Sequence, residues 1–233
     1  MIYELMCGWA VVNASLTAPE PQNLKDKASV KISKEEPLKI KGDVAQFMTS
    51  QKVTVFMGNV QMTHAGNFLV CETLKAYGET ADRAERTECF GKVLWRDDAR
   101  GAVLTCDMAI YEKSVSHLIA RGNPILVVDR AGIKTVVKGE ELEIFQRDQR
   151  ALAHRKVHVT RLTTTATGEE AEYNYRIEEV KMTGQPVVTQ KKSVFKGKEI
   201  WLFLKEDRVE IRNEVDAEVY PEDVEEEKPK ENK

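Results

Sequence analysis

The phrase Met57-Gly58-Asn59-Val60 returns along the chain as Phe90-Gly91-Lys92-Val93, as Arg121-Gly122-Asn123-Pro124 and, without its glycine, as His154-Arg155-Lys156-Val157. The three glycines are 33 and 31 residues apart, and Arg155 follows Gly122 after another 33 residues. A fixed period of about 20 to 50 residues is typical of a stacked-repeat fold, because each unit buries its apolar face only against its neighbours. The function of such a stack is expected in its groove or at its edges, not in a cluster of catalytic side chains.

A second phrase lies between the first ones and keeps the same period. It occupies residues 69–77 and 104–111, continues at 137–144 and has a looser copy at 197–203. Cys71 and Cys106 are 35 residues apart in these copies. Two phrases that stay in step predict two strand-like segments in each repeat, whereas residues 162–172 interrupt the period.

Both phrases alternate apolar and polar residues, which is the pattern of half-buried strands. Val53 and Met57 share one face, and we expect the alternation to shift by one residue at Gly58, so that Val60 and Met62 point inward. A glycine at such a shift predicts a bulge or bend in the middle of a strand. The predicted fold class is therefore all-β, a stack of antiparallel strands built from repeats of about 32 residues.

Composition divides the chain into four segments. Residues 1–18 contain a short apolar run followed by small residues, as in the second half of a secretory signal, but no basic residue precedes the run. A truncated signal and an ordinary first strand both remain open. Residues 19–37 are predicted to be a linker or leading strand, and 38–213 the repeat domain. Residues 214–233, with nine acidic and three basic side chains, are predicted to be a disordered tail.

Charge and motif content exclude several function classes. The formal net charge is −3 and no basic stripe occurs, so we expect no nucleic-acid partner. His154 and His158 are four residues apart, which on a strand separates them by about 13 Å. No Cys-x-x-Cys pair, nucleophile elbow, P-loop or dinucleotide fingerprint is present. We predict no enzyme activity, no catalytic residue, no metal site and no cofactor.

The cysteines leave two alternatives. Cys71 and Cys106 occupy equivalent positions in the repeat, so a disulfide between them is possible. Two small buried apolar side chains would explain the same positions, and this interpretation is favoured.

Residues 39–47, 53–60 and 74–77 resemble the OstA-like, LptA-type family of lipopolysaccharide-transport proteins, whose members repeat an apolar-x-Ala-Asp…Tyr…Gly-Asn-Val pattern. Further matches are residues 105–111, 120–124 and 138–144. The resemblance covers residues 38–161 well and 174–213 loosely. Glutamate replaces the usual aspartate at Glu72 and Glu140, and Arg155 replaces a glycine.

This resemblance implies an open β-jellyroll, or β-taco, exported to the periplasm. It implies a non-enzymatic bridge or chaperone that carries lipopolysaccharide, or a related acylated glycolipid, to the outer membrane. Its edge strands would join other OstA-like modules at the inner and outer membranes, or further copies of the chain end to end. The predicted lipid-binding lining is Val60, Met62, Leu74, Val93, Trp95, Tyr111, Leu126, Ile144, Val159 and Phe203. The alternative is a structural β-repeat scaffold with a closed core that assembles through its edge strands.

Overall fold

The computed structural model describes residues 37–64 and 66–220. The predicted signal segment 1–18, nearly all of the predicted linker 19–37 and residues 221–233 of the predicted tail lie outside these ranges. The described chain forms a single sheet of 18 strands and two three-residue 3-10 helices, η1 (Thr49–Gln51) and η2 (Ala81–Arg83). The all-β prediction is confirmed. In these ranges, no helix has the length and apolar character needed to cross a membrane.

Six strands are long and run across the whole sheet. They are β3 (Val53–His64), β4 (Asn67–Tyr77), β5 (Arg86–Asp97), β6 (Ala102–Glu112), β11 (Arg150–Arg161) and β12 (Thr164–Asn174). The other twelve are short: β1 (Lys39–Lys41), β2 (Val44–Met48), β7 (His117–Arg121), β8 (Ile125–Arg130), β9 (Ile133–Lys138), β10 (Glu141–Phe145), β13 (Glu179–Thr183), β14 (Val187–Gln190), β15 (Ser193–Lys196), β16 (Glu199–Phe203), β17 (Arg208–Arg212) and β18 (Asp216–Glu218).

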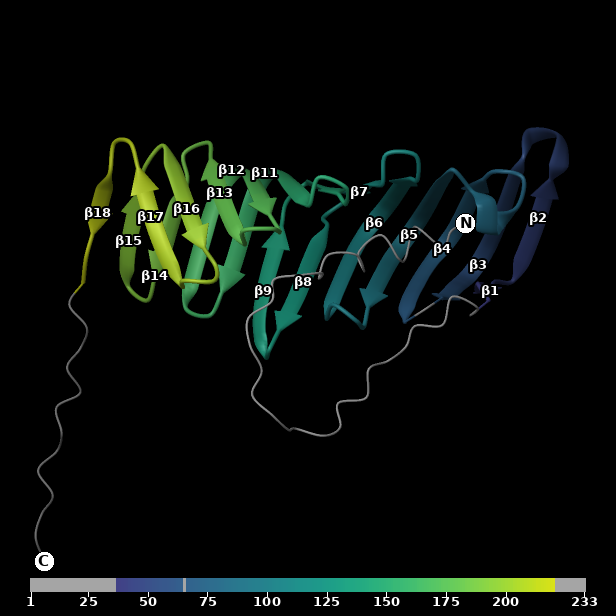
Figure 1. Ribbon diagram of the computed structural model, residues 1–233, viewed down its shortest axis with the longest axis horizontal. Coiled ribbons are helices and arrows are strands. Elements are labelled where there is room, and N and C mark those ends of the chain that lie inside the picture. Colours follow the sequence, from purple (N-terminus) through teal and green to yellow (C-terminus); the bar gives the residue numbers. More distant parts are fainter. Residues whose placement is uncertain (1–36, 65, 221–233) are drawn as a thin grey trace, which may run out of the picture.

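The sheet is bent along its middle into two layers. The first layer holds β2, β7, β10, β13, β16 and β17 with one half of each long strand. The second layer holds β1, β8, β9, β14, β15 and β18 with the other halves. All pairings are antiparallel, and the stack runs from β1 and β2 at one end to β17 and β18 at the other (Figure 1).

A pair of consecutive left-handed residues makes the bend in every second strand of the stack. The pairs and their φ angles are Gly58 and Asn59 (75°, 47°), Gly91 and Lys92 (76°, 47°), Gly122 and Asn123 (75°, 51°), Arg155 and Lys156 (58°, 51°), Gly184 and Gln185 (76°, 56°), and Asn213 and Glu214 (62°, 56°). In β3 the two residues lie opposite a single residue of β4, because Met57 pairs with Thr73 and Val60 with Cys71. The predicted bulge is therefore present, and it recurs down the stack.

A charged residue on the preceding strand faces each bend. At five of the six bends it lies 15 residues before the first left-handed residue; these residues are Asp43, Asp107, Glu140, Glu169 and Lys198, and the sixth is Glu72. The backbone N–H groups of the five donate to carbonyl oxygens at their bends, as from Asp43 to Met57 and Gly58, both 3.0 Å. A Cβ atom on Gly58, Gly91 or Gly122 would lie within 3 Å of the facing carboxylate side chain. The bend and the acid are therefore one packed unit.

Where the second residue of the bend is polar, its side chain also pairs with the facing acid. The Asn59 amide donates to the Asp43 carboxylate at 3.0 Å, and Lys92 pairs with Glu72 at 3.1 Å. At the bend of Arg155 and Lys156, which lacks glycine, hydrogen bonds from Lys156 and Arg155 lower the pKa of the Glu140 carboxyl. The last bend carries the reverse arrangement, because Lys198 replaces the acid and pairs with Glu214.

Two details of the predicted pattern are wrong. The one-residue change of alternation falls on the strand of the acid, where Cys71 and Leu74 both face inward, and not on the glycine strand, where Phe56 and Val60 keep one phase. The two left-handed residues add an even number to their own strand, so its inward and outward positions keep alternating as before. The single residue opposite them shifts the alternation of the partner strand by one. Residues 162–172 do not leave the period either, because β12 carries Gly168 and Glu169 opposite the bend at Gly184.

The end of the fold also lies beyond its predicted boundary at residue 213. Asn213 and Glu214 make the last bend, and β18 follows and pairs with β15. The first part of the predicted acidic tail therefore belongs to the sheet.

The three cysteines in the described ranges, Cys71, Cys89 and Cys106, are free thiols buried in the interior. Cys71 lies on β4 and Cys106 on β6, and β5 runs between these strands. Two strand spacings separate the residues by about 10 Å, whereas a disulfide needs Cα atoms closer than about 7 Å. The favoured interpretation, small buried side chains, fits the structure.

We expect Gly91→Ala to lower the free energy of unfolding by about 3 kcal/mol, because it adds a steric clash with Glu72 to the cost of a left-handed residue. Gly132→Ala is the matched control, since Gly132 has φ of 83° but open space around its Cβ position. That change is expected to cost only about 1 kcal/mol. Urea unfolding of both variants measures the difference, and equal losses would show that the packed acid contributes nothing.

The thiols are expected to be unreactive in the folded protein. Burial raises the pKa of Cys106 to about 12, and a hydrogen bond with Cys71 together with burial raises the pKa of Cys89. The same hydrogen bond lowers the pKa of Cys71, so the protection of Cys71 depends on its burial. In a Cys7→Ser variant at pH 8, we expect Ellman's reagent to label Cys71, Cys89 and Cys106 at least about 100-fold more slowly than in the urea-unfolded chain. Fast labelling of the native protein would contradict this burial.

Candidate functional site

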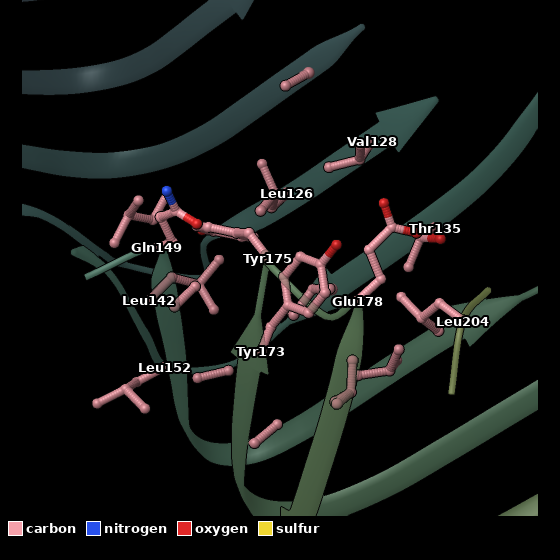
Figure 2. A pocket seen from close by; sticks show the side chains of 18 of the residues that line it. Leu126, Val128, Thr135, Leu142, Gln149, Leu152, Tyr173, Tyr175, Glu178 and Leu204 are labelled. Carbon is pink, nitrogen blue, oxygen red and sulfur yellow. The ribbon is translucent and has the colours of Figure 1, made fainter. Parts of the chain in front are cut away.

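A cavity of about 590 Å³ lies between the two layers in the second half of the stack. Its wall in the second layer comes from β8, β9 and β11, with Leu126, Val137 and Val159. Its wall in the first layer comes from β10 to β13, with Leu142 and Ile144. Figure 2 shows Leu126 and Val128 on one side of this space and Leu142 on another. The volume falls in the range of about 300–1,000 Å³ that is usual for small-molecule sites.

Small side chains create the space. Ala102 and the three first-layer residues Ala151, Ala153 and Ala171 line the cavity. At equivalent positions of the first repeat the interior carries larger groups. Leu74, which is completely buried, corresponds to Ala171, and Phe56, which packs against the core, corresponds to Ala153. The layers therefore enclose a filled core around β3 to β6 and leave a cavity around β8 to β13.

Two tyrosines stand between the apolar interior and the outer lip of the cavity. The rings of Tyr173 and Tyr175 meet edge to face, with centroids 4.6 Å apart. Burial raises the pKa of both phenols, so both are neutral at physiological pH. The cavity can hold an apolar group, and its phenols stay uncharged.

The lip of the cavity is strongly basic. Arg100, Arg130, Arg161, Arg176 and Lys205 line it, with Glu178 as the single acid of the lining. Arg130 of β8 pairs with Glu178, next to β13, at 2.9 Å, so this ion pair joins the two layers. Arg161 of β11 donates to the carbonyl oxygen of Leu204, which follows β16, at 3.2 Å. The lips are thus bridged by two arginines.

The predicted lining residues separate into three groups. Leu126, Ile144 and Val159 line the cavity. Another six pack in the core between the layers: Val60, Met62, Leu74, Val93 and Tyr111, which are buried, and Trp95, which is half-buried against them. Phe203 belongs to neither group.

Phe203 lies on the outer face of the sheet, so the prediction that it faces the interior is wrong. On β16 the inward positions belong to Ile200 and Leu202. Phe203 instead stacks beside Trp201, and the Arg208 guanidinium lies 3.7 Å from its ring centroid. In residues 197–203 aromatic and aliphatic side chains alternate, and both kinds are apolar. The alternation therefore does not tell which of the two faces is inside.

Sequence reasoning missed Ala171, Tyr173 and Val180. The second and fourth residues after the facing acid point inward in each repeat, as Ala109 and Tyr111 do after Asp107. Applying this rule to Glu169 finds Ala171 and Tyr173. The expected interruption of the repeat at residues 162–172 hides this register in the sequence.

A separate polar cluster covers the outer face of β7, β10, β11 and β12. The ligand atoms of Glu141, Glu143 and His154 lie within 4.8 Å of one another. His117 contacts Glu143 at 2.7 Å, His154 contacts Glu143 at 3.1 Å and also Glu170, and Arg121 pairs with Glu141. Cross-strand ion pairing accounts for this cluster.

A comparison with curated proteins finds none that matches the chain. Among solved structures, the chain is similar to LptH of Pseudomonas aeruginosa, described as the LptA homologous periplasmic component of the lipopolysaccharide transport device. The identity is 16%, the match covers 80% of this chain and 97% of that one, and the TM-score is 0.28.

The family comparison is decisive. The model of the family described as "LptA/(LptD N-terminal domain) LPS transport protein" matches residues 39–208, which is most of the chain and nearly all of the bent sheet. The chain therefore belongs to the LptA and LptD N-terminal family of lipopolysaccharide transport proteins.

Proposed function

We propose that this protein is a non-enzymatic carrier that holds the acyl chains of a lipopolysaccharide-type glycolipid between the layers of its sheet, in the periplasm, on the way to the outer membrane. The observation that carries the proposal is the 590 Å³ apolar cavity between β8, β9 and β11 on one side and β10 to β13 on the other. A buried methylene contributes about 0.8 kcal/mol, so acyl chains gain affinity from such a space. Membership of the transport family supplies the ligand class.

The ends of the stack support a role as one module in a bridge. Among the described strands, β2 pairs with β3 alone and β17 with β16 alone. Phe47 and Val44 of β2 are 71% and 48% exposed, and Val215, Val219 and Tyr220 are exposed at the opposite end. Unpaired edges with apolar side chains favour strand addition. The proposed partners are other OstA-like modules at the two membranes and further copies of this chain.

The alternative, a scaffold with a closed core, has one observation in its favour. The interior around β3 to β6 is filled by side chains such as Val60, Leu74 and Val93, each at most 1% exposed. A carrier would then hold its ligand in the second half of the stack, whereas a scaffold would hold none. The two functions differ in whether a lipid reaches Tyr173.

We expect a photoreactive benzoylphenylalanine at Tyr173 to crosslink to lipopolysaccharide, because this side chain lines the cavity. The same group at Trp201, on the outer face, is the matched control and is expected to give no crosslink. A third position, Tyr111, reports on the filled core. After ultraviolet irradiation, a shift in the gel mobility of the protein measures the crosslink to lipopolysaccharide. Equal labelling at Tyr173 and Trp201, or none at any position, would favour the scaffold.

Assembly through the β2 edge is expected to be sensitive to charge at Phe47. Phe47→Lys places an ammonium group in the apolar end contact, so we expect end-to-end association to weaken by about tenfold. Ile177→Lys is the control, because Ile177 is 48% exposed but lies in a turn between β12 and β13. Sedimentation velocity across a concentration series measures association. A wild-type chain that stays monomeric would contradict end-to-end assembly.

A further inference from the structure

We infer that the basic lip of the cavity binds a phosphate group on the headgroup of the lipid whose chain fills the interior, with Arg130 and Arg161 as its main ligands. This inference rests on the proposed function and specifies the ligand as a phosphorylated amphiphile. It begins from the distribution of charge on the cavity lining, where five basic residues face one acidic residue. Arg130, Arg176 and Lys205 are exposed and so lie toward the opening, whereas Arg100 and Arg161 are half-buried.

Arg161 has unused capacity for an anion. One terminal nitrogen of its guanidinium donates to the Leu204 carbonyl oxygen at 3.2 Å, and the other makes a long contact of 3.4 Å with the Thr135 hydroxyl. The Nε atom is buried and has no hydrogen-bond partner among the described residues. The Gln146 Oε1 atom, also on the lining, is buried and unpartnered in the same way. Unpaired buried polar atoms are costly, and a bound polar headgroup would satisfy them.

Arg130 already holds a carboxylate at the lip. Its side chain is 57% exposed, and it reaches across the opening to Glu178, which is 25% exposed. This ion pair places an anion at the entrance of the cavity. A phosphate forms the same kind of charge-assisted hydrogen bonds with arginine and often binds it through two of them. Glu178 therefore occupies the place of the ligand anion and competes with it.

The remaining basic groups favour an anion over a neutral headgroup. Burial lowers the pKa of the Arg100 guanidinium, whose charge the buried Asp97 balances. Arg176 and Lys205 are exposed on the same lip and add positive potential. An amphiphile that enters with its chain directed to Leu142 and Val159 would leave its phosphate at this lip. The geometry thus fixes which end of the ligand enters first.

The test compares two probes with the same acyl chains, a bis-phosphorylated lipid A and its dephosphorylated form, in displacement of the neutral fluorophore N-phenylnaphthylamine from the full chain. We expect the phosphorylated probe to bind about tenfold more tightly at low salt. Arg130→Gln and Arg161→Gln are each expected to remove most of this preference, without a loss of affinity for the dephosphorylated probe. Glu178→Gln is expected to strengthen binding of the phosphorylated probe alone.

Arg212→Gln is the charge-matched control, because Arg212 lies over Trp201 on the outer face and donates to Glu210. It should leave the preference unchanged. Equal affinity for both probes in the wild type, or an equal effect of Arg212→Gln and Arg130→Gln, would overturn the phosphate site and leave the carrier intact. Failure of both probes to displace the fluorophore would overturn the carrier itself. Arg130 is largely exposed, so its variant tests the inference even if Arg161→Gln does not fold.

Discussion

The structure depends on one local constraint, the pair of left-handed residues packed against a charged side chain on the neighbouring strand. A left-handed conformation costs roughly 1–2 kcal/mol for a residue with a Cβ atom, so glycine is favoured at the first position. Four of the six bends have it. The cost is partly offset because the backbone N–H of the facing residue, as at Asp107 and Glu169, bonds to the carbonyl oxygen of the bend. Without this unit the strands would run straight, and the sheet would have no interior.

The bends that lack glycine show what the charge contributes. Arg155 replaces glycine and places its guanidinium on Glu140 at 2.9 Å, and Lys156 contacts the same carboxylate at 2.7 Å. At the last bend the charges are exchanged between Lys198 and Glu214. An exposed ion pair contributes less free energy than the left-handed conformation costs. The facing pair therefore specifies the register of the bend, and burial of the layers supplies the stability.

The sequence was sufficient to predict the period, the all-β stack and the bulge at Gly58, because these follow from residue types with a specific backbone preference. The sequence also predicted that Leu126, Ile144 and Val159 face the interior, where they line the cavity. It failed at Phe203, because strand alternation identifies two faces without saying which is inside. It also failed to find the cavity, which arises where Ala151, Ala153 and Ala171 replace larger side chains. The spacing of a pattern carries no information about the volume between two layers.

The division of the interior into a filled and a hollow part has a physical consequence for a carrier. Around β3 to β6 the layers are held together by complete burial of Leu74 and Val93, so this part acts as a rigid support. Around the cavity that contribution is missing, and Arg130 and Arg161 bridge the lips instead. An acyl segment of about eight methylenes would contribute roughly 6 kcal/mol on entry, well above the roughly 1 kcal/mol of an exposed ion pair. On the proposed function, the chain therefore supplies the affinity and opens the lips, while the arginines decide which headgroup stays at the entrance.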